Sequence, residues 1–310
     1  MRRVTLLIAL LCAAAPAAAA LPESYTVIAG GTPVGHLKVE QNDGRIAIDY
    51  DYKNNGRGPT LAETLELDAR GRPQRWQIRG NTTFGSQVDE NFERDNSAVR
   101  WRDSVGEGSA EADADALYVA QGASPWALGL YARALLSAED GRLPAWPGGE
   151  LRVEAGERLE AGEGAERVGL RFHAISGLSL NPSYFLLDDS GAFFGVVSPR
   201  FAVIRAGYEA DAQRLGERAE ALARGRLEKI QQDTARRFEA PVRVRNVRVF
   251  EPQRLALSAP VDVVFFRGRI TGVQPAGMPA SAGEVLIEGE GGRDRNSTRL
   301  NSSHCRISRM

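Results

Sequence analysis

Apolar and polar residues alternate along the chain from Tyr25 to about Val119, in several short stretches. Turn-forming sequences separate these stretches, among them Asn42-Asp43-Gly44, Asn54-Asn55-Gly56 and Asp95-Asn96-Ser97. Alternation puts the apolar side chains on one face of a strand, and Asn-Gly or Asp-Gly pairs favour tight hairpins. The pattern therefore predicts a meander of antiparallel strands with one buried and one solvated face.

The apolar spacing becomes helical in two places. From Ser124 to Leu136, Ser124 is predicted to cap a helix and Pro125 to occupy its first position. The apolar face of this helix is formed by Leu128, Tyr131, Ala132 and Leu135. The longest helical candidate runs from Tyr208 to Phe238, and Pro241 ends it.

Between the helices the signal is weaker. Residues 142–164 are rich in Pro, Gly and Glu, which predicts a loop around one short strand at 151–153. Strand patterns resume at 166–175, 184–187 and 192–197, the last two joined by an Asp-Asp-Ser-Gly turn. The whole pattern predicts an α+β fold that is mainly antiparallel β.

Residues 1–20 have the pattern of a secretory signal peptide. Arg2 and Arg3 supply the positive start, and an apolar core and a run of alanines follow. We expect export to the periplasm or the medium, with no transmembrane segment in the mature chain. A lipoprotein anchor at Cys12 is disfavoured because Leu11, rather than a small residue, precedes it.

Charge and cysteine content narrow the function classes. The chain has 39 Lys+Arg and 40 Asp+Glu, but the leader carries two arginines and the residues after Gly292 carry five arginines and one aspartate. Without these segments 32 basic and 39 acidic residues remain, a net charge of −7. Such a body has no electrostatic footprint for nucleic acid. The two cysteines of the chain, Cys12 and Cys305, lie in the leader and in the residues after Gly292. No disulfide or thiolate site is therefore expected in the body.

Few side chains suggest chemistry. The histidines of the body, His36 and His173, lie far apart in sequence and cannot by themselves build a catalytic metal site. No Gly-x-Ser-x-Gly element accompanies Ser176. The other groups are interpreted as turn, loop or core residues: the acidic pairs Asp188-Asp189 and Asp113/Asp115, the sequon at Asn81, and Trp76, Trp101, Trp126 and Trp146. We therefore assign no catalytic, cofactor-binding or metal-binding residue.

The region from Pro241 to Gly292 carries the clearest motifs. Asn246-Val247-Arg248-Val249-Phe250, then Asp262-Val263 with Gly268-Arg269-Ile270, then Ile287-Glu288-Gly289-Glu290-Gly291 follow one another. This order resembles the opening of the metal-dependent amidohydrolase superfamily. The segments from Asn54 to Pro59, Thr82 to Phe92 and Ser183 to Asp189 are similar to a β-rich extension that precedes the hydrolase domain in some exported bacterial amidohydrolases.

The resemblance implies a partial β-sandwich at 241–292 that would flank a (β/α)8 barrel, hydrolysis of C–N bonds in amide, cyclic amide or dipeptide-like substrates, and a Zn-type metal in the parent. The family's His-x-His ligands would follow Gly292, so we expect this fragment to be inactive, and whether it is an enzyme stays open. Residues 294–304 instead resemble a translated sequencing adapter, which makes 293–310 an artefactual, disordered tail.

The predicted organisation is therefore a signal peptide at 1–20, a β-rich domain at 21–206, a helical connector at 207–240, the partial sandwich at 241–292 and the tail. A different class stays open. A cysteine-free β-rich chain could instead be a periplasmic ligand-binding or interaction module without catalysis, whose protein partners the sequence does not identify.

Overall fold

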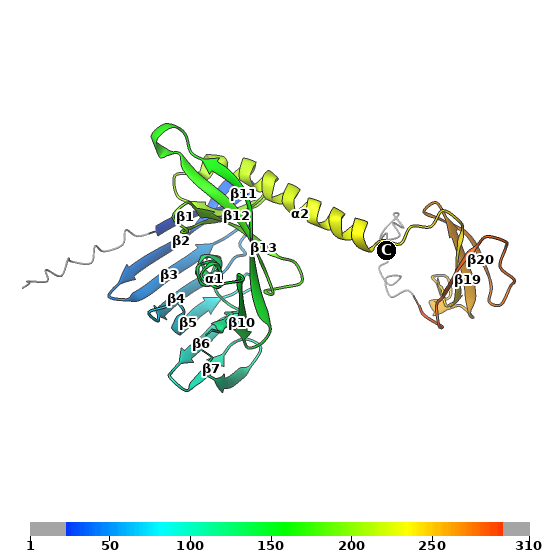
Figure 1. The fold of residues 1–310 in the computed structure, drawn as a ribbon, viewed down its shortest axis with the longest axis horizontal. Coiled ribbons are helices and arrows are strands. Elements are labelled where there is room, and N and C mark those ends of the chain that lie inside the picture. The colour runs from blue at the N-terminus through cyan, green and yellow to red at the C-terminus, as the bar shows by residue number, and fades with distance from the viewer. Residues whose placement is uncertain (1–22, 114, 294–310) are drawn as a thin grey trace, which may run out of the picture. The chain divides into compact units, whose positions relative to one another are not determined.

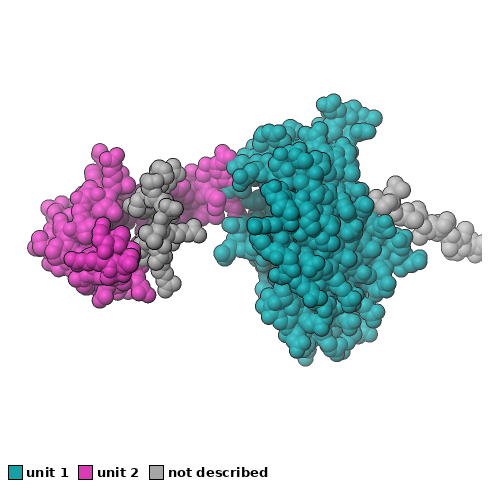
Figure 2. Space-filling view, turned by 180° about the vertical axis from the view of Figure 1, so that it is seen from behind, with its two compact units in different colours: residues 1–223 teal, residues 224–310 magenta. Residues whose placement is uncertain are grey.

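The computed structural model describes residues 23–113 and 115–293, so the predicted leader and almost all of the predicted tail lie outside the described residues. The chain divides into two compact units, Met1–Ala223 and Arg224–Met310 (Figure 2). Each unit is built around its own β-sheet. The fold is thus a β-rich α+β fold with a large, mostly antiparallel sheet, one long helix and a smaller sheet.

Unit 1 contains a fifteen-stranded sheet in the order β8-β7-β6-β5-β4-β3-β2-β1-β15-β14-β13-β12-β11-β10-β9 (Figure 1). Its strands are β1 (Glu23–Ala29), β2 (Thr32–Asn42), β3 (Arg45–Tyr52), β4 (Thr60–Leu67), β5 (Pro73–Asn81), β6 (Gln87–Arg94), β7 (Ala98–Arg102), β8 (Glu107–Glu111), β9 (Leu117–Tyr118), β10 (Arg142–Trp146), β11 (Glu150–Ala161), β12 (Val168–Ser176), β13 (Ser183–Asp188), β14 (Phe193–Ser198) and β15 (Phe201–Arg205). Short 3-10 helices lie at Gly164–Glu166 and Glu209–Asp211.

The predicted meander is confirmed, because β1 to β8 pair in sequence order and antiparallel. Asp95 illustrates the turns that connect them. Its Oδ1 accepts the backbone N–H groups of Ser97 and Ala98, each at 2.8 Å. The pairing of β1 with β15 joins this meander to a second one, and β9 and β10 at the far end run parallel.

Helix α1 (Ala127–Leu136) lies against the concave face of this sheet (Figure 1). The two arms of the sheet also meet, because Phe92 of β6 stacks on Tyr118 of β9 with ring centroids 4.3 Å apart. Enclosure explains why the helix is buried on most sides, including Gly129, Leu130 and Ala134, rather than on one face as predicted. The predicted cap is wrong, since the helix begins after Trp126 without a side-chain cap.

Helix α2 (Ala212–Thr234) confirms the second predicted helix over a shorter range. Its first turns bury Ala212, Leu215 and Ala219 against the opposite face of the sheet, in a second core with Phe172 and Phe194. Farther along the helix Leu227 is 60% exposed. The division between the two units falls within this helix.

The loop predicted at 142–164 is wrong. β10 and β11 occupy most of this region, and β11 pairs with β12 over most of its length. A bulge between Ala155 and Arg158 interrupts that pairing. Long-range pairing overrides the weak local propensity of Gly- and Glu-rich sequence, because β-structure depends on its neighbours more than on intrinsic preference.

Unit 2 contains a four-stranded sheet in the order β20-β19-β16-β21. β16 (Val242–Val247) pairs antiparallel with β19 (Val261–Phe266) and parallel with β21 (Val285–Glu288), while β20 (Arg269–Pro275) completes the sheet beside β19. A separate hairpin joins β17 (Phe250–Glu251) to β18 (Ala256–Leu257). Arg243 of β16 is only 2% exposed, and its Nε donates to Glu284 at 2.7 Å.

Candidate functional site

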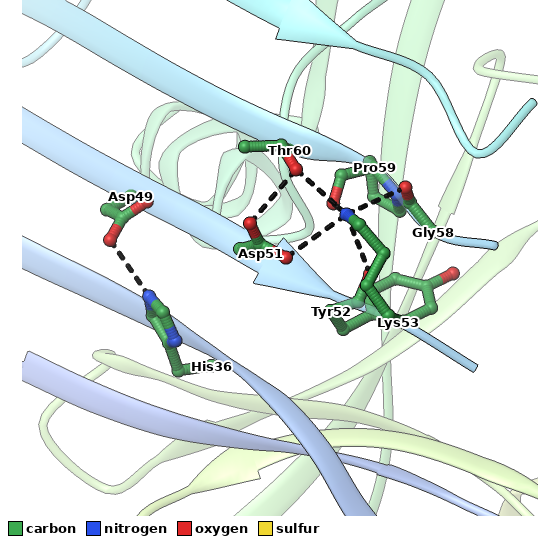
Figure 3. A network of polar contacts seen from close by, with 8 residues as sticks. All are labelled: His36, Asp49, Asp51, Tyr52, Lys53, Gly58, Pro59 and Thr60. Carbon is green, nitrogen blue, oxygen red and sulfur yellow. Dashed lines mark hydrogen bonds and ion pairs between the residues drawn. The ribbon is translucent and has the colours of Figure 1, made fainter. Parts of the chain in front are cut away.

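The two histidines do not come together. His36 lies on β2, where its Nε2 is 2.8 Å from Oδ2 of Asp49, an exposed hydrogen-bond contact visible in Figure 3. His173 lies on β12, which four strands separate from β2 in the sheet order. It is only 5% exposed and stacks on Phe185, and burial holds its pKa below the ordinary value, which favours the neutral imidazole.

The acidic pairs serve as turn and ion-pair residues. Asp188 accepts the N–H groups of Ser190 and Ala192 and pairs with Arg205 at 2.8 Å. Asp115 pairs with Arg70 at 3.0 Å. Among the described residues no group of three or more His, Cys, Asp or Glu side chains could hold a metal ion. Ser176 lies at the end of β12.

The tryptophans are mainly core residues. Trp76, Trp126 and Trp146 are buried, whereas Trp101 is partly exposed. No described helix combines the length and apolarity needed to cross a membrane.

The sequence patterns did not reveal two carboxylates on the buried face of the sheet. Glu63 of β4 and Glu90 of β6 are each 2% exposed. Both are opposite Ile78 of the intervening strand β5, so the three side chains form one row across the sheet. The sequence could have indicated the burial of Glu63, because in the strand alternation this residue falls between Leu61 and Leu65 and therefore lies on the apolar face.

Both carboxylates bind the segment that leads into helix α1. Glu90 Oε1 accepts the Tyr118 hydroxyl at 2.6 Å and the Gln121 N–H at 3.0 Å, and Oε2 accepts the Gly122 N–H at 2.7 Å. Glu63 Oε1 accepts the Ser124 N–H at 2.7 Å. We call Glu63 and Glu90 the carboxylate clamp.

Glu63 completes the clamp by accepting the indole Nε1–H of Trp76 at 2.9 Å. Burial raises the pKa of both glutamates, and the negative charge of Glu90 adds to the rise at Glu63. Because every carboxylate oxygen already accepts a hydrogen bond from the protein, the clamp is better suited to hold the loop before α1 than to act on a substrate.

An exposed polar network lies at one end of strands β3 and β4 (Figure 3). Lys53 Nζ contacts five oxygen atoms, including Asp51 Oδ1 at 3.1 Å and Thr60 Oγ1 at 2.8 Å. The other three are backbone carbonyls of Tyr52, Gly58 and Pro59 at 3.0 to 3.2 Å. The ammonium group thus fixes the β3–β4 turn.

A surface hollow of about 730 Å³ adjoins this turn. Its wall contains Arg57, Asn81, Thr83 and Phe84 from the β3–β4 and β5–β6 turns. The Phe84 ring is 82% exposed. In the described part of the chain the Arg57 guanidinium has no ion pair, so the hollow combines an available cation, amide and hydroxyl groups and an aromatic face.

No family model and no curated protein matches the chain. Among solved structures it is similar to a β-barrel-like protein of the domain of unknown function DUF1849 from Brucella abortus, with 12% identity and a TM-score of 0.36, covering 59% of this chain and 94% of that chain. It is also similar to a DUF1089 family protein from Pseudomonas aeruginosa, with 15% identity and a TM-score of 0.26, covering 66% and 93%.

Proposed function

We propose that this chain is the non-catalytic front portion of an exported, metal-dependent amidohydrolase. The parent would hydrolyse C–N bonds in amide, cyclic amide or dipeptide-like substrates. The observation that carries the proposal is the arrangement of the segments that resemble the family. They supply all four strands of one sheet, with the first and last segments, β16 and β21, paired in parallel.

Two features of unit 2 support a role as one half of a β-sandwich. Val244, Val263 and Ile287 lie on one face of its sheet, and all three stay partly exposed. The opposite face contains the buried ion pair of Arg243 and Glu284. An apolar face that is only partly covered is typical of a sheet that packs against a second layer.

The described residues do not fit a catalytic metal. A Zn²⁺ site needs several converging nitrogen, oxygen or sulfur ligands, and the two described histidines lie on separate strands without such a group. On this proposal, the chemistry of the parent belongs to its barrel.

Two experiments test the proposal. The gene should be sequenced from intact genomic DNA: a reading frame that encodes His-x-His shortly beyond Gly292 supports it, and a stop codon there contradicts it. The purified chain should also be incubated with Zn²⁺ and a panel of amides, beside an active zinc amidohydrolase. We expect background hydrolysis, and turnover with tight stoichiometric metal binding would refute the assignment of an inactive front portion.

The hollow near Lys53 favours a second candidate function, ligand binding by unit 1. Its available guanidinium, amide and hydroxyl groups suit a hydroxylated anion, and the exposed Phe84 ring suits a sugar face. Calorimetry with glucuronate tests this function. Arg57→Gln should weaken binding about tenfold, whereas Arg200→Gln, at another exposed arginine, should not. Equal affinities would exclude Arg57, and no binding would exclude this ligand class.

A further inference from the structure

A second groove of about 370 Å³ lies between helix α1 and the sheet of unit 1. Its apolar lining includes Val39, Ile46 and Leu67 from the sheet and Trp126 beside the helix. Glu23, Arg133 and Arg70 also line it, and Arg70 is paired with Asp115 at 3.0 Å. The groove therefore places acidic and basic side chains beside an apolar surface, which is the composition of many small-molecule sites.

Glu23 is positioned by two buried aromatic residues. Its Oε2 accepts the Tyr25 hydroxyl at 2.5 Å and the Trp126 indole N–H at 3.0 Å. Both aromatic side chains are at most 3% exposed, so this oxygen is rigidly placed. Oε1 of Glu23 makes no hydrogen bond with the described residues and remains available as an acceptor.

Arg133 is held above the same tryptophan. Its Cζ lies 5.4 Å from the centre of the Trp126 ring, a cation–π contact. In the part of the chain that the structure describes, its guanidinium forms no ion pair. Glu23 and Arg133 thus both contact Trp126, yet they are not paired with each other, and each keeps hydrogen-bonding capacity for a ligand.

We propose that this groove binds a small zwitterion, a free amino acid or short peptide, with its ammonium group on Glu23, its carboxylate on Arg133 and an apolar side chain against Ile46 and Leu67. An ammonium supplies the donors that Glu23 lacks, and a carboxylate matches the planar guanidinium in a bidentate pair. The site requires no catalysis, so it does not depend on the hydrolase assignment.

Isothermal titration of the purified chain with alanyl-leucine tests the site. We expect a dissociation constant at or below about 1 mM. N-acetylation of the peptide removes its ammonium and amidation removes its carboxylate, and each change should weaken binding roughly tenfold. No detectable binding of alanyl-leucine, or equal binding of all three peptides, would overturn the proposal without any protein variant.

Protein variants then locate the contacts. Arg133→Gln should lower affinity for alanyl-leucine about tenfold yet bind the amidated peptide as the unaltered chain does. Glu23→Gln should likewise remove the penalty of N-acetylation. Arg158→Gln is a matched control on β11, because that side chain is exposed outside the groove. An Arg133→Gln protein that still discriminates against the amide would refute the assigned orientation.

Discussion

Replacing Glu90 by glutamine should destabilise unit 1 measurably. The carboxylate accepts three hydrogen bonds, from Tyr118, Gln121 and Gly122. Glutamine has one carbonyl oxygen, so at least one of these donors would face an NH2 group and lose its acceptor. A donor left unsatisfied in a buried position costs about 1–3 kcal/mol.

Removal of a buried charge offsets part of that loss, because burial already disfavours ionised Glu90. We therefore expect a net loss of about 1 kcal/mol, at the lower end of the range for one orphaned donor. For a domain of this size, such a loss lowers the melting temperature by roughly 2–4 °C.

Urea unfolding followed by tryptophan fluorescence is a suitable assay. The four tryptophans of the chain all lie in unit 1, so the signal reports on that unit alone. Glu93→Gln is a matched control, because Glu93 lies on the same strand with an exposed side chain. Its effect should stay within about 0.5 kcal/mol. A Glu90→Gln protein as stable as this control would refute the view that the clamp secures the loop before α1.

Three further predictions concern the carboxylate clamp, Lys53 and the sheet of unit 2. Burial raises the pKa of Glu63 and Glu90, so the folded chain keeps protons that the unfolded chain releases above about pH 4.3. The unfolding free energy should therefore fall as the pH rises toward the folded-state pKa of the two groups. Urea titrations at several pH values should show a flatter dependence of the unfolding free energy on pH in the Glu63→Gln/Glu90→Gln double variant. Lys53→Met removes five oxygen contacts and should speed amide hydrogen exchange in the β3–β4 turn about tenfold. Lys38→Met, at an exposed side chain, is the control and should leave the exchange rate unchanged. Equal exchange rates in the two variants would contradict the role of Lys53. Deleting the residues after Phe238 removes a sheet with two open edges and should raise soluble yield, and an unchanged or lower yield would argue against edge-driven aggregation.

The sequence predicted the structure best where the stabilising contacts join residues that are close together in the chain. Turns such as the one at Asp95 are closed by contacts within a few residues, so their sequences predicted the meander. The long helix was also predicted, although its ends lie at Ala212 and Thr234 rather than at Tyr208 and Phe238. Helix ends depend on the contacts of the first and last turns, which a repeating apolar pattern does not specify.

The candidate sites could largely not be predicted from the sequence. Arg133 and Glu23 are 110 positions apart and share a groove only because the fold brings the start of β1 to Trp126, just before helix α1. Glu63 and Glu90 could have been noticed as acidic residues in an apolar alternation. Their hydrogen-bond partners Gln121 and Ser124 could not have been identified from the sequence. These residues belong to the segment before α1, which reaches the two carboxylates only when the sheet folds around that helix.

Periodicity and short turn motifs were enough to predict the strands and turns of the first meander and the presence of the two helices, since these features depend on residues close together in the chain. Tertiary structure alone decided that β1 pairs with β15, that residues 150–161 form a long strand and that α1 is enclosed by the sheet. The physical reason is that strand partners and buried polar contacts join residues far apart in the chain, so their free energy is gained only when the whole sheet assembles.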